Sequence, residues 1–389
     1  MTDSVKQRRR RVPGKHLELG SRGMKKVLLG TTAIVAAGMI ASSPASAAEK
    51  ISAKVGGYME QWIGYASVDD AANRDVDGFD IKSDSEIHFT GSTTLDNGIE
   101  FGVNVQLEAN SNSGDQIDES YLIVKGSFGE INLGSENSAM YKMHYAPTDY
   151  GITLNSGDQI DWAAVSGSGI STGGYFRNPY GSTYIEPAAN NDSEKLTYYT
   201  PRFGGFQLGV SYSPDATQDS NTTPDRDAVN SDMVAIGANF KGDFAGASVG
   251  LSGGYGTFLN APAGADEPIA YNVGLTVGFG GFSVGGSYAK SEDNSTGIDG
   301  DGYNIGVAYT TGPLGVSLTY FNGEREGTTT AGVTTGQAEQ KTVHLSANYT
   351  LGPGVTAAAT LGHAEFDSDD AGLGSNEATY FVTGIKLSF

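Results

Sequence analysis

EFGVNVQLE, residues 100–108, is the stretch that decides the class of fold. Its odd positions from 101 to 107 are Phe, Val, Val and Leu, whereas Asn104, Gln106 and Glu108 occupy even positions. Strict alternation of apolar and polar residues is typical of a β-strand that is apolar on one face only. The stretch therefore predicts a strand rather than a helix.

The same alternation recurs along the chain in segments of about ten residues separated by turn residues. A strand of a soluble sandwich also alternates, so this pattern does not by itself select a membrane barrel. The segments predict sixteen strands, an even number as in closed antiparallel barrels. They are residues 51–67, 80–95, 99–109, 119–127, 131–139, 195–201, 206–213, 232–242, 246–258, 269–279, 282–291, 302–311, 315–325, 341–351, 355–366 and 377–389.

The connections between these segments alternate between short and long. Short ones include Asp96-Asn97-Gly98 and Gly280-Gly281, whose Gly and Asn residues supply the positive φ of tight hairpins. Long polar ones include residues 214–231 and 326–340. Short turns at one end and long loops at the other are typical of outer-membrane barrels. We therefore predict an all-β protein, a transmembrane antiparallel β-barrel of about sixteen strands.

Composition excludes a membrane protein that spans the bilayer by helices and a protein built on disulfides or thiolate metal sites. The hydrophobic share is 38% and the mean hydropathy is −0.27, and the only apolar run, residues 27–41, is shorter than the roughly 20 residues that a spanning helix needs. The chain contains no cysteine, so neither a disulfide framework nor a thiolate metal site can form.

The N-terminal run predicts export. Met24, Lys25 and Lys26 form a positive start, an apolar stretch follows, and Ala45-Ser46-Ala47 is a cleavage site of the A-x-A type. Residues 24–47 are thus expected to be a signal peptide, with the mature chain beginning at Ala48. Residues 1–23, which include four consecutive arginines, are interpreted as a mis-called start or an extended leader. A nucleic-acid-binding arm is disfavoured because export would remove it.

Charge narrows the partners of the exported chain. The whole sequence has a formal charge of −21. Residues 1–47 hold nine of the 24 Lys and Arg but only two of the 45 Asp and Glu, so the rest of the chain has a charge of −28. Such a field repels nucleic acid and attracts cations.

Four stretches resemble the Gram-negative general porin family, and the resemblance covers residues 48–389. They are GGYME (56–60), ESYLIVKGSFGEINLG (119–134), LTYYTPRFGGF (196–206) and the terminal IKLSF (385–389). The resemblance implies a non-enzymatic outer-membrane diffusion channel that forms a homotrimer. It also implies that Phe389 is the assembly signal read by the barrel-assembly machinery.

The longest connection, about residues 140–194, needs a functional reason, because structureless loops of this length are uncommon. The resemblance implies that it folds into the lumen and narrows the pore. Irregular backbone at membrane depth is tolerated where it lines a water-filled cavity. An external cap of solvated residues is the alternative. The carboxylates expected at the constriction are Asp149, Asp158, Asp161 and Glu186.

In the family, basic residues on the opposite wall face these carboxylates. The candidates here are Lys54, Lys82 and Lys125, and Ser135 stands where related porins often have Arg. This departure weakens the basic cluster. Together with the charge of −28, it predicts a preference for cations.

We find no signature of a catalytic site. None of the histidines lies in a hydrolase motif, although a membrane-embedded hydrolase using His88, His344 or His363 stays open as an alternative. His363 is interpreted as lying on the face opposite Leu361. No cofactor is expected. The acidic stretches 299–301 and 367–370 are interpreted as solvated loop tips, with loop-bound calcium that bridges lipopolysaccharide as the alternative.

The predicted function is passive diffusion of ions and small hydrophilic solutes across the outer membrane, with lipid and lipopolysaccharide as surroundings. Three alternatives stay open beside the hydrolase: a substrate-specific channel of the sugar type, a plugged structural or adhesive surface barrel, and a soluble β-sandwich.

Overall fold

The structure is a computed structural model of residues 1–389. It describes residues 50–69, 77–110, 116–156, 159–163, 177–218, 222–292, 299–326, 328–330, 333–368 and 375–389. The chain divides into two units, Met1–Ala48 and Glu49–Phe389, and every described residue belongs to the second. The expected leader and signal peptide therefore lie outside the described residues.

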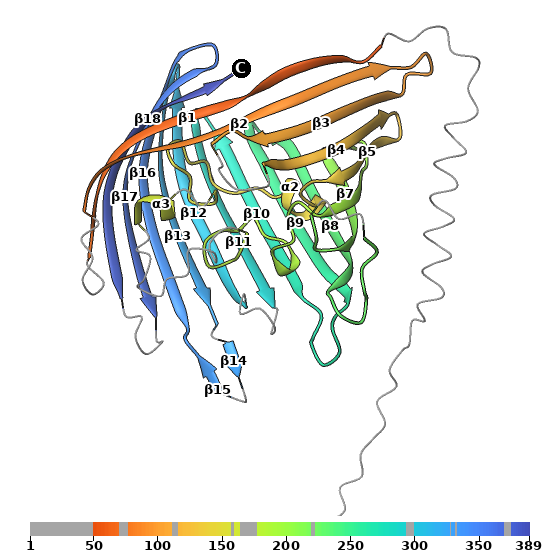
Figure 1. Cartoon of the computed structure of the whole chain (residues 1–389). Coiled ribbons are helices and arrows are strands. Elements are labelled where there is room, and N and C mark those ends of the chain that lie inside the picture. The colour runs from red at the N-terminus through yellow and green to blue at the C-terminus, as the bar shows by residue number, and fades with distance from the viewer. Residues whose placement is uncertain are drawn as a thin grey trace, which may run out of the picture. The chain divides into compact units, whose positions relative to one another are not determined.

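Sixteen strands of the described chain form a closed antiparallel barrel (Figure 1). Closure is made by β1 and β18, with Trp62 opposite Gly384, and it removes the exposed sheet edges that favour aggregation. The strands are β1 (Ser52–Val68), β2 (Gly78–Thr94), β3 (Glu100–Glu108), β4 (Ile117–Gly126), β5 (Gly129–Ser135), β6 (Glu194–Tyr199), β7 (Phe206–Asp215), β8 (Ser231–Phe244), β9 (Ala247–Asn260), β10 (Ile269–Phe279), β11 (Phe282–Glu292), β12 (Gly300–Thr311), β13 (Leu314–Arg325), β16 (Ala338–Gly352), β17 (Val355–Ser368) and β18 (Asn376–Ser388).

The predicted barrel and its sixteen strands are confirmed, with two local differences. The fifth strand ends at Ser135 rather than at residue 139, because the backbone N–H of Ser138 donates to the Glu186 carboxylate (2.6 Å) and the chain turns away from the sheet. The connection between β13 and β16 contains a separate two-stranded hairpin, β14 (Thr328–Thr330) and β15 (Val333–Thr335). No helix of the described residues is long and apolar enough to cross a membrane.

The outward face of the barrel is apolar. Val103, Leu122, Leu133 and Leu196 are successive cross-strand partners on β3 to β6, and all are 39–53% exposed. At the short turns, exposed aromatic rings pair, as Phe282 does with Tyr309 (4.5 Å between ring centroids). Apolar residues turned outward and aromatic rings near strand ends are what a bilayer requires of a barrel.

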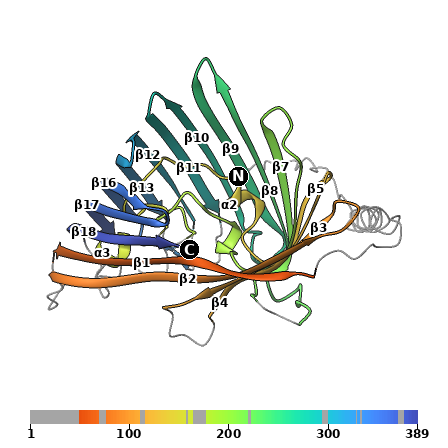
Figure 2. The same cartoon turned by 90° about the horizontal axis from the view of Figure 1, so that it is seen from above.

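The connection between β5 and β6, residues 136–193, packs against the inward faces of the strands, and we call it the inner loop. In Figure 2, seen from above, its yellow segments lie within the ring of strands. It contains α2 (Ala139–Lys142), α3 (Gln159–Ala163) and the 3-10 turn η2 (Pro187–Ala189). Glycines on the wall make room for it: a Cβ on Gly274 would lie 1.8 Å from the Tyr145 carbonyl oxygen.

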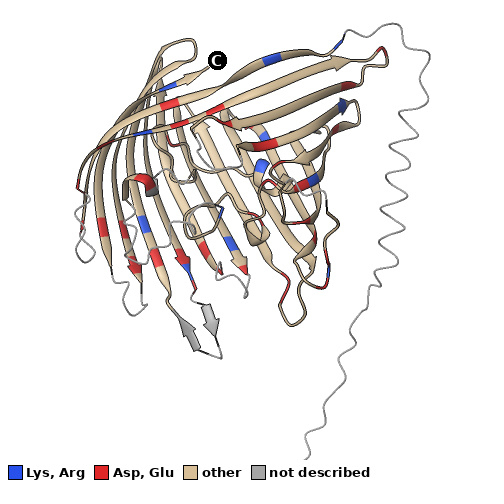
Figure 3. Cartoon of the chain, in the orientation of Figure 1, with Lys and Arg blue, Asp and Glu red and all other residues tan. Residues whose placement is uncertain are grey.

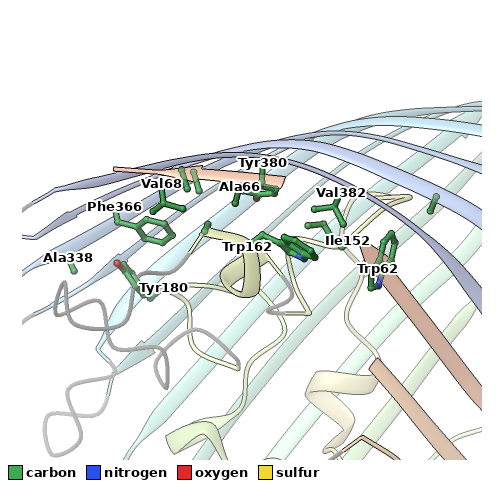
Figure 4. Close-up of a cluster of buried hydrophobic side chains, with 14 residues drawn as sticks. Trp62, Ala66, Val68, Ile152, Trp162, Tyr180, Ala338, Phe366, Tyr380 and Val382 are labelled. Atoms are coloured by element: carbon green, nitrogen blue, oxygen red, sulfur yellow. The ribbon is translucent and has the colours of Figure 1, made fainter. Parts of the chain in front are cut away.

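The buried apolar side chains lie between the inner loop and the wall. One cluster joins Ile152, Trp162 and Tyr180 of the loop to wall residues that include Trp62, Tyr380 and Val382 (Figure 4). A second joins Met140 and Ile185 of the loop to residues of β8 to β11 such as Met233 and Phe258. The hydrophobic core is therefore inside the barrel and fixes the loop, whereas the outward face of the barrel is exposed.

Candidate functional site: the barrel interior

The inward faces of β1 to β4 form an acidic wall. It consists of Glu60 on β1, Asp84 and Glu86 on β2, Glu108 on β3 and Glu119 on β4, and Figure 3 shows acidic positions in red along these strands. Alternation places these residues on the face opposite to the exposed apolar one. In the sheet register, Glu60 is the direct partner of Asp84, and Glu86 is the direct partner of Glu108. Like charges directly opposite each other destabilise a sheet.

Neutral groups supply most of the hydrogen bonds to the acidic wall. The Tyr58 hydroxyl donates to both oxygens of Asp84 at 3.3 Å. The side-chain amides of Gln106 and Asn137 each donate to Glu119 at 2.6 Å. These donors orient the carboxylates without cancelling their charge, so the wall keeps an excess of negative charge.

Three basic side chains inside the barrel are paired with carboxylates. Lys82 bonds Asp80 (2.6 Å), Lys386 bonds Glu60 (3.1 Å) and Lys142 bonds Glu136 (2.5 Å). Aromatic rings lie beside the same cations: Lys82 lies 5.1 Å from the ring centre of Trp162, and Lys386 lies 5.3 Å from that of Trp62. This arrangement neutralises each of these three bases locally.

The three bases expected on the wall all belong to inward faces. Lys82 reaches the inner loop at Trp162. Lys125 shares its face with Tyr121 and bonds Glu130 at 3.3 Å. Lys54 is exposed near the start of β1, where its register partner is Thr90. The three residues are distributed over the wall, and Ser135 uses its hydroxyl to hold the inner loop at the Asp192 carbonyl.

Asp149 attaches the inner loop to the wall on the far side of the barrel. Its carboxylate accepts a hydrogen bond from Thr319 (3.1 Å) and lies 3.4 Å from Nδ1 of His344, whose Nε2 lies 2.7 Å from the Tyr380 hydroxyl. Burial acts to raise the pKa of Asp149, but the hydrogen bond and charge of His344, with further hydroxyl donors, hold that pKa below its usual range. Asp149 is thus ionised and fixed in place.

Glu186 is also buried, at the base of the loop. Its carboxylate accepts the N–H of Ser138 and lies 3.7 Å from Arg177. Asp192 lies 4.0 Å from the same guanidinium, and burial, which Arg177 only partly opposes, raises the pKa of Asp192 to about 7. Of the other two predicted loop carboxylates, Asp161 in α3 is exposed and Asp158 lies outside the described residues.

Histidines have structural contacts. His344 is fully buried with both ring nitrogens occupied, and His88 lies 3.3 Å from Glu86. The interpretation that His363 and Leu361 lie on opposite faces is wrong: they are two residues apart on a regular strand and so share the outward face.

Among described residues, no group of three or more acidic or histidine side chains could hold a metal ion. Asp369 and Asp370 of the calcium alternative lie outside the described residues.

Sequence reasoning missed the acidic wall as a unit and most of the bases that the inner loop uses. Alternation could have identified the wall, because Glu60, Asp84 and Glu108 all lie at inward positions of predicted strands. Arg177 and Lys142 left no such signal, since they lie in the inner loop, outside the alternating strands. Further inward bases that were missed are Lys195, Lys241 and Arg325.

A family model described as "Gram-negative porin" matches residues 30–369. This chain belongs to that family. The assignment agrees with a closed barrel that is apolar outside and charged inside, and it identifies the porin as an outer-membrane channel. The family and the fold both point to a non-enzymatic protein.

Several curated relatives are similar to the porin. It is 25% identical over 317 residues to a protein of Halomonas sp named monosaccharide porin, covering 76% of this chain and 70% of the relative. It is 24% identical to outer membrane porin protein 32 of Delftia acidovorans, covering 72% and 68%. An uncharacterized protein of Rickettsia conorii is 24% identical, with 69% and 76% covered.

Solved structures share the fold. The anion-selective porin from Comamonas acidovorans aligns with a TM-score of 0.55 at 18% identity, covering 87% of this chain and all of that chain. The trimer form of OmpT from Vibrio cholerae aligns with a TM-score of 0.56 at 14% identity, covering 88% and 100%. At these identities the likeness shows the barrel and leaves the ion preference open.

Proposed function

We propose that this porin is a passive diffusion channel for ions and small hydrophilic solutes and that it prefers cations. The acidic wall is the observation that supports the preference. Glu60 opposite Asp84 and Glu86 opposite Glu108 form like-charged pairs that cost stability, so a role in the lumen explains their presence. A lining rich in carboxylates raises the local concentration of cations.

The proposed mechanism is filtration. The inner loop reduces the open cross-section, and the acidic wall biases which ions pass through the space that is left. Some of the bases that would favour anions are bound to a carboxylate, as Lys82 is to Asp80 and Lys386 to Glu60, whereas Lys195 bonds backbone carbonyls and Lys241 lies over the ring of Tyr145. No bond of the solute is made or broken, so we propose no enzymatic step.

The test is reconstitution of residues 48–389 in a planar bilayer under a KCl gradient. We expect stepwise currents and a reversal potential that favours K⁺. Replacing the central carboxylates, Asp84→Asn, Glu86→Gln and Glu108→Gln together, should move the reversal potential toward zero. A matched control neutralises three exposed carboxylates on the connections, Asp96→Asn, Asp227→Asn and Glu267→Gln, and should leave it near the wild-type value.

Two outcomes would count against the proposal in different ways. An anion-favouring reversal potential in the wild type would refute the cation preference and leave the channel intact. Persistent absence of current from folded protein would refute diffusion itself and favour the plugged structural barrel.

We also propose a homotrimer, to which the trimer form of OmpT lends support as a structural neighbour. Analytical ultracentrifugation of the detergent-solubilised porin should give three protomers, and a stable monomer would refute the proposal.

Phe389 is proposed as an assembly signal. Its ring is 66% exposed, while its backbone exchanges two hydrogen bonds with Gly57 (3.0 and 3.1 Å) and so extends the seam between β18 and β1. The variant Phe389→Ala keeps these backbone bonds. We expect it to lower the yield of folded barrel in cells but not the yield of refolding in detergent; equal yields in cells would refute the signal.

A further inference from the structure

A cavity of about 330 Å³ lies between the inner loop and the wall at β12 and β13, apart from the acidic wall. We call it the niche. Its lining includes the rings of Tyr141 and Tyr184, the amides of Asn155 and Asn304, and Thr319 with Asp149. The volume is at the small end of the range for ligand pockets in proteins, which suits a small solute. Tyr141, Asn155 and Tyr184 are each half-buried, so solvent reaches the niche.

A chain of hydrogen bonds across the loop and the wall orients the two amides. The oxygen of Asn155 accepts the Thr183 N–H (2.8 Å), and the Thr183 hydroxyl lies 2.7 Å from that of Ser287 on β11. Ser287 in turn donates to the oxygen of Asn304 on β12. Both amide oxygens are therefore occupied by protein donors. Neither amide nitrogen donates a hydrogen bond to another residue of the described chain, and both residues line the niche.

Aromatic and apolar groups form the rest of the lining. The rings of Tyr141 and Tyr184 lie 5.4 Å apart at 62°, and each is braced by a neighbour: Arg177 lies 4.6 Å from the ring centre of Tyr141, and His144 packs edge-on against Tyr184 at 4.7 Å. Pro147 and Leu154 extend the apolar surface. Rings that are held in place need no ordering when a ligand binds, which favours affinity.

The charged side chain in the lining of the niche already has protein partners. Asp149, the carboxylate in the lining, is bound by Thr319 and His344. Two oriented N–H₂ donors beside aromatic rings match a ligand that has several hydroxyl oxygens and an apolar C–H face. We propose that the niche binds a neutral polyhydroxylated solute of monosaccharide size. This inference rests on the proposed function, because it adds a solute class to the same channel.

The first experiment uses the wild-type porin in a planar bilayer and glucose as the probe. Glucose is added to symmetric KCl, and the control is a polyethylene glycol too large to enter, at matched viscosity. We expect the glucose-dependent loss of current to saturate. A loss that only follows viscosity would overturn the niche and leave the diffusion channel intact, whereas absence of any current would refute the proposed function itself.

Two variants assign the binding to the amides. Asn155→Asp and Asn304→Asp each keep the acceptor oxygen of the hydrogen-bond chain and remove the N–H₂ donors. Each should raise the half-saturating glucose concentration about fivefold, as expected for the loss of one hydrogen bond. Asn104→Asp is the control, because it adds the same charge to the inward face of β3, outside the niche. Unchanged saturation in both niche variants would overturn the assignment.

Discussion

The wall at β1 to β4 and the wall from β7 to β18 differ in what their inward faces carry. The first carries the carboxylates Glu60, Asp84, Glu86 and Glu108 on its inward face and contacts the inner loop at a few side chains, as Lys82 does at Trp162. The second receives the inner loop, with glycines such as Gly274 where the backbones approach and with hydroxyl groups that bond the loop. Both walls have the same apolar outward face, so the bilayer does not distinguish them.

The difference teaches what lets an irregular loop stay inside a barrel. Its buried polar groups need partners, because a polar group left without one costs about 1–3 kcal/mol. The covered wall supplies them: the Tyr150 N–H donates to Ser317 and the Ile152 N–H to Thr360, both at 3.1 Å. On the acidic wall, Glu60, Asp84 and Glu108 are half-buried and so reach solvent, whereas Glu86 and Glu119 are only 7% and 6% exposed.

The largest effect should come from filling the covered wall. Gly274→Val places a side chain where the Tyr145 carbonyl lies, and overpacking of this kind costs about 1–3 kcal/mol. We expect a lower urea midpoint of unfolding and an altered single-channel conductance. Gly253→Val on β9 is the control, since a Cβ there would have no neighbour closer than 3.9 Å. Equal effects of the two variants would contradict the close packing of the inner loop on the covered wall.

Next in size is the loss of the Asp149 attachment. Asp149→Asn removes the charge that His344 and Thr319 hold, and it should weaken the attachment by about 1–3 kcal/mol. The sequence has two tryptophans, so the emission of Trp162 in a Trp62→Phe background reports on the loop alone. We expect a red shift, and a control variant, Asp161→Asn, should show none.

The same residue predicts a pH dependence. The pKa of Asp149 is held below its usual range, so its contribution is present above the unfolded pKa of about 3.9 and is lost as pH falls through the lowered folded value. The emission of Trp162 should therefore shift in acid in the Trp62→Phe background. Adding Asp149→Asn should reduce this acid transition, and an identical titration would contradict the attachment.

A smaller effect should come from increasing the net negative charge of the acidic wall. Lys386→Gln removes the cation beside Glu60. The reversal potential should therefore move closer to the equilibrium potential of K⁺. Lys290→Gln removes a cation near the end of β11, where Lys290 pairs with the exposed Glu292, and serves as the control. A shift toward Cl⁻ in Lys386→Gln would contradict the role of the wall.

The smallest effect is expected at Lys125. Its pair with Glu130 is partly exposed on both sides, and such pairs contribute about 0–1 kcal/mol. Lys125→Gln should leave the urea midpoint nearly unchanged and move the reversal potential less than Lys386→Gln does. A larger selectivity change at Lys125 would restore it as a main basic residue of the pore wall.

Much of the barrel could be predicted because its signal is local. Strand position follows from alternation over a few residues, as in 100–108, and the tight turns follow from Gly and Asn. Strand ends were less certain where a distant group intervenes: β5 ends at Ser135 because Glu186, far along the chain, binds the N–H of Ser138. The error at His363 was one of counting, since residues two apart share a face.

The interior was harder to predict, because its contacts join residues that the sequence separates widely. Asp149 was predicted as a pore carboxylate, yet its partners lie on β13 and β16, and His344 is itself bonded to Tyr380 on β18, so only closure of the barrel brings these residues together. The niche depends in the same way on Asn155 and Asn304, which only the packed loop brings to the lining of one cavity. Alternation therefore determined the strands and their two faces, since that pattern repeats every two residues, and the alternation of short and long connections predicted the barrel. Tertiary structure decided which inward carboxylates stay open to the lumen and which hold the loop, because that choice depends on contacts across the closed barrel.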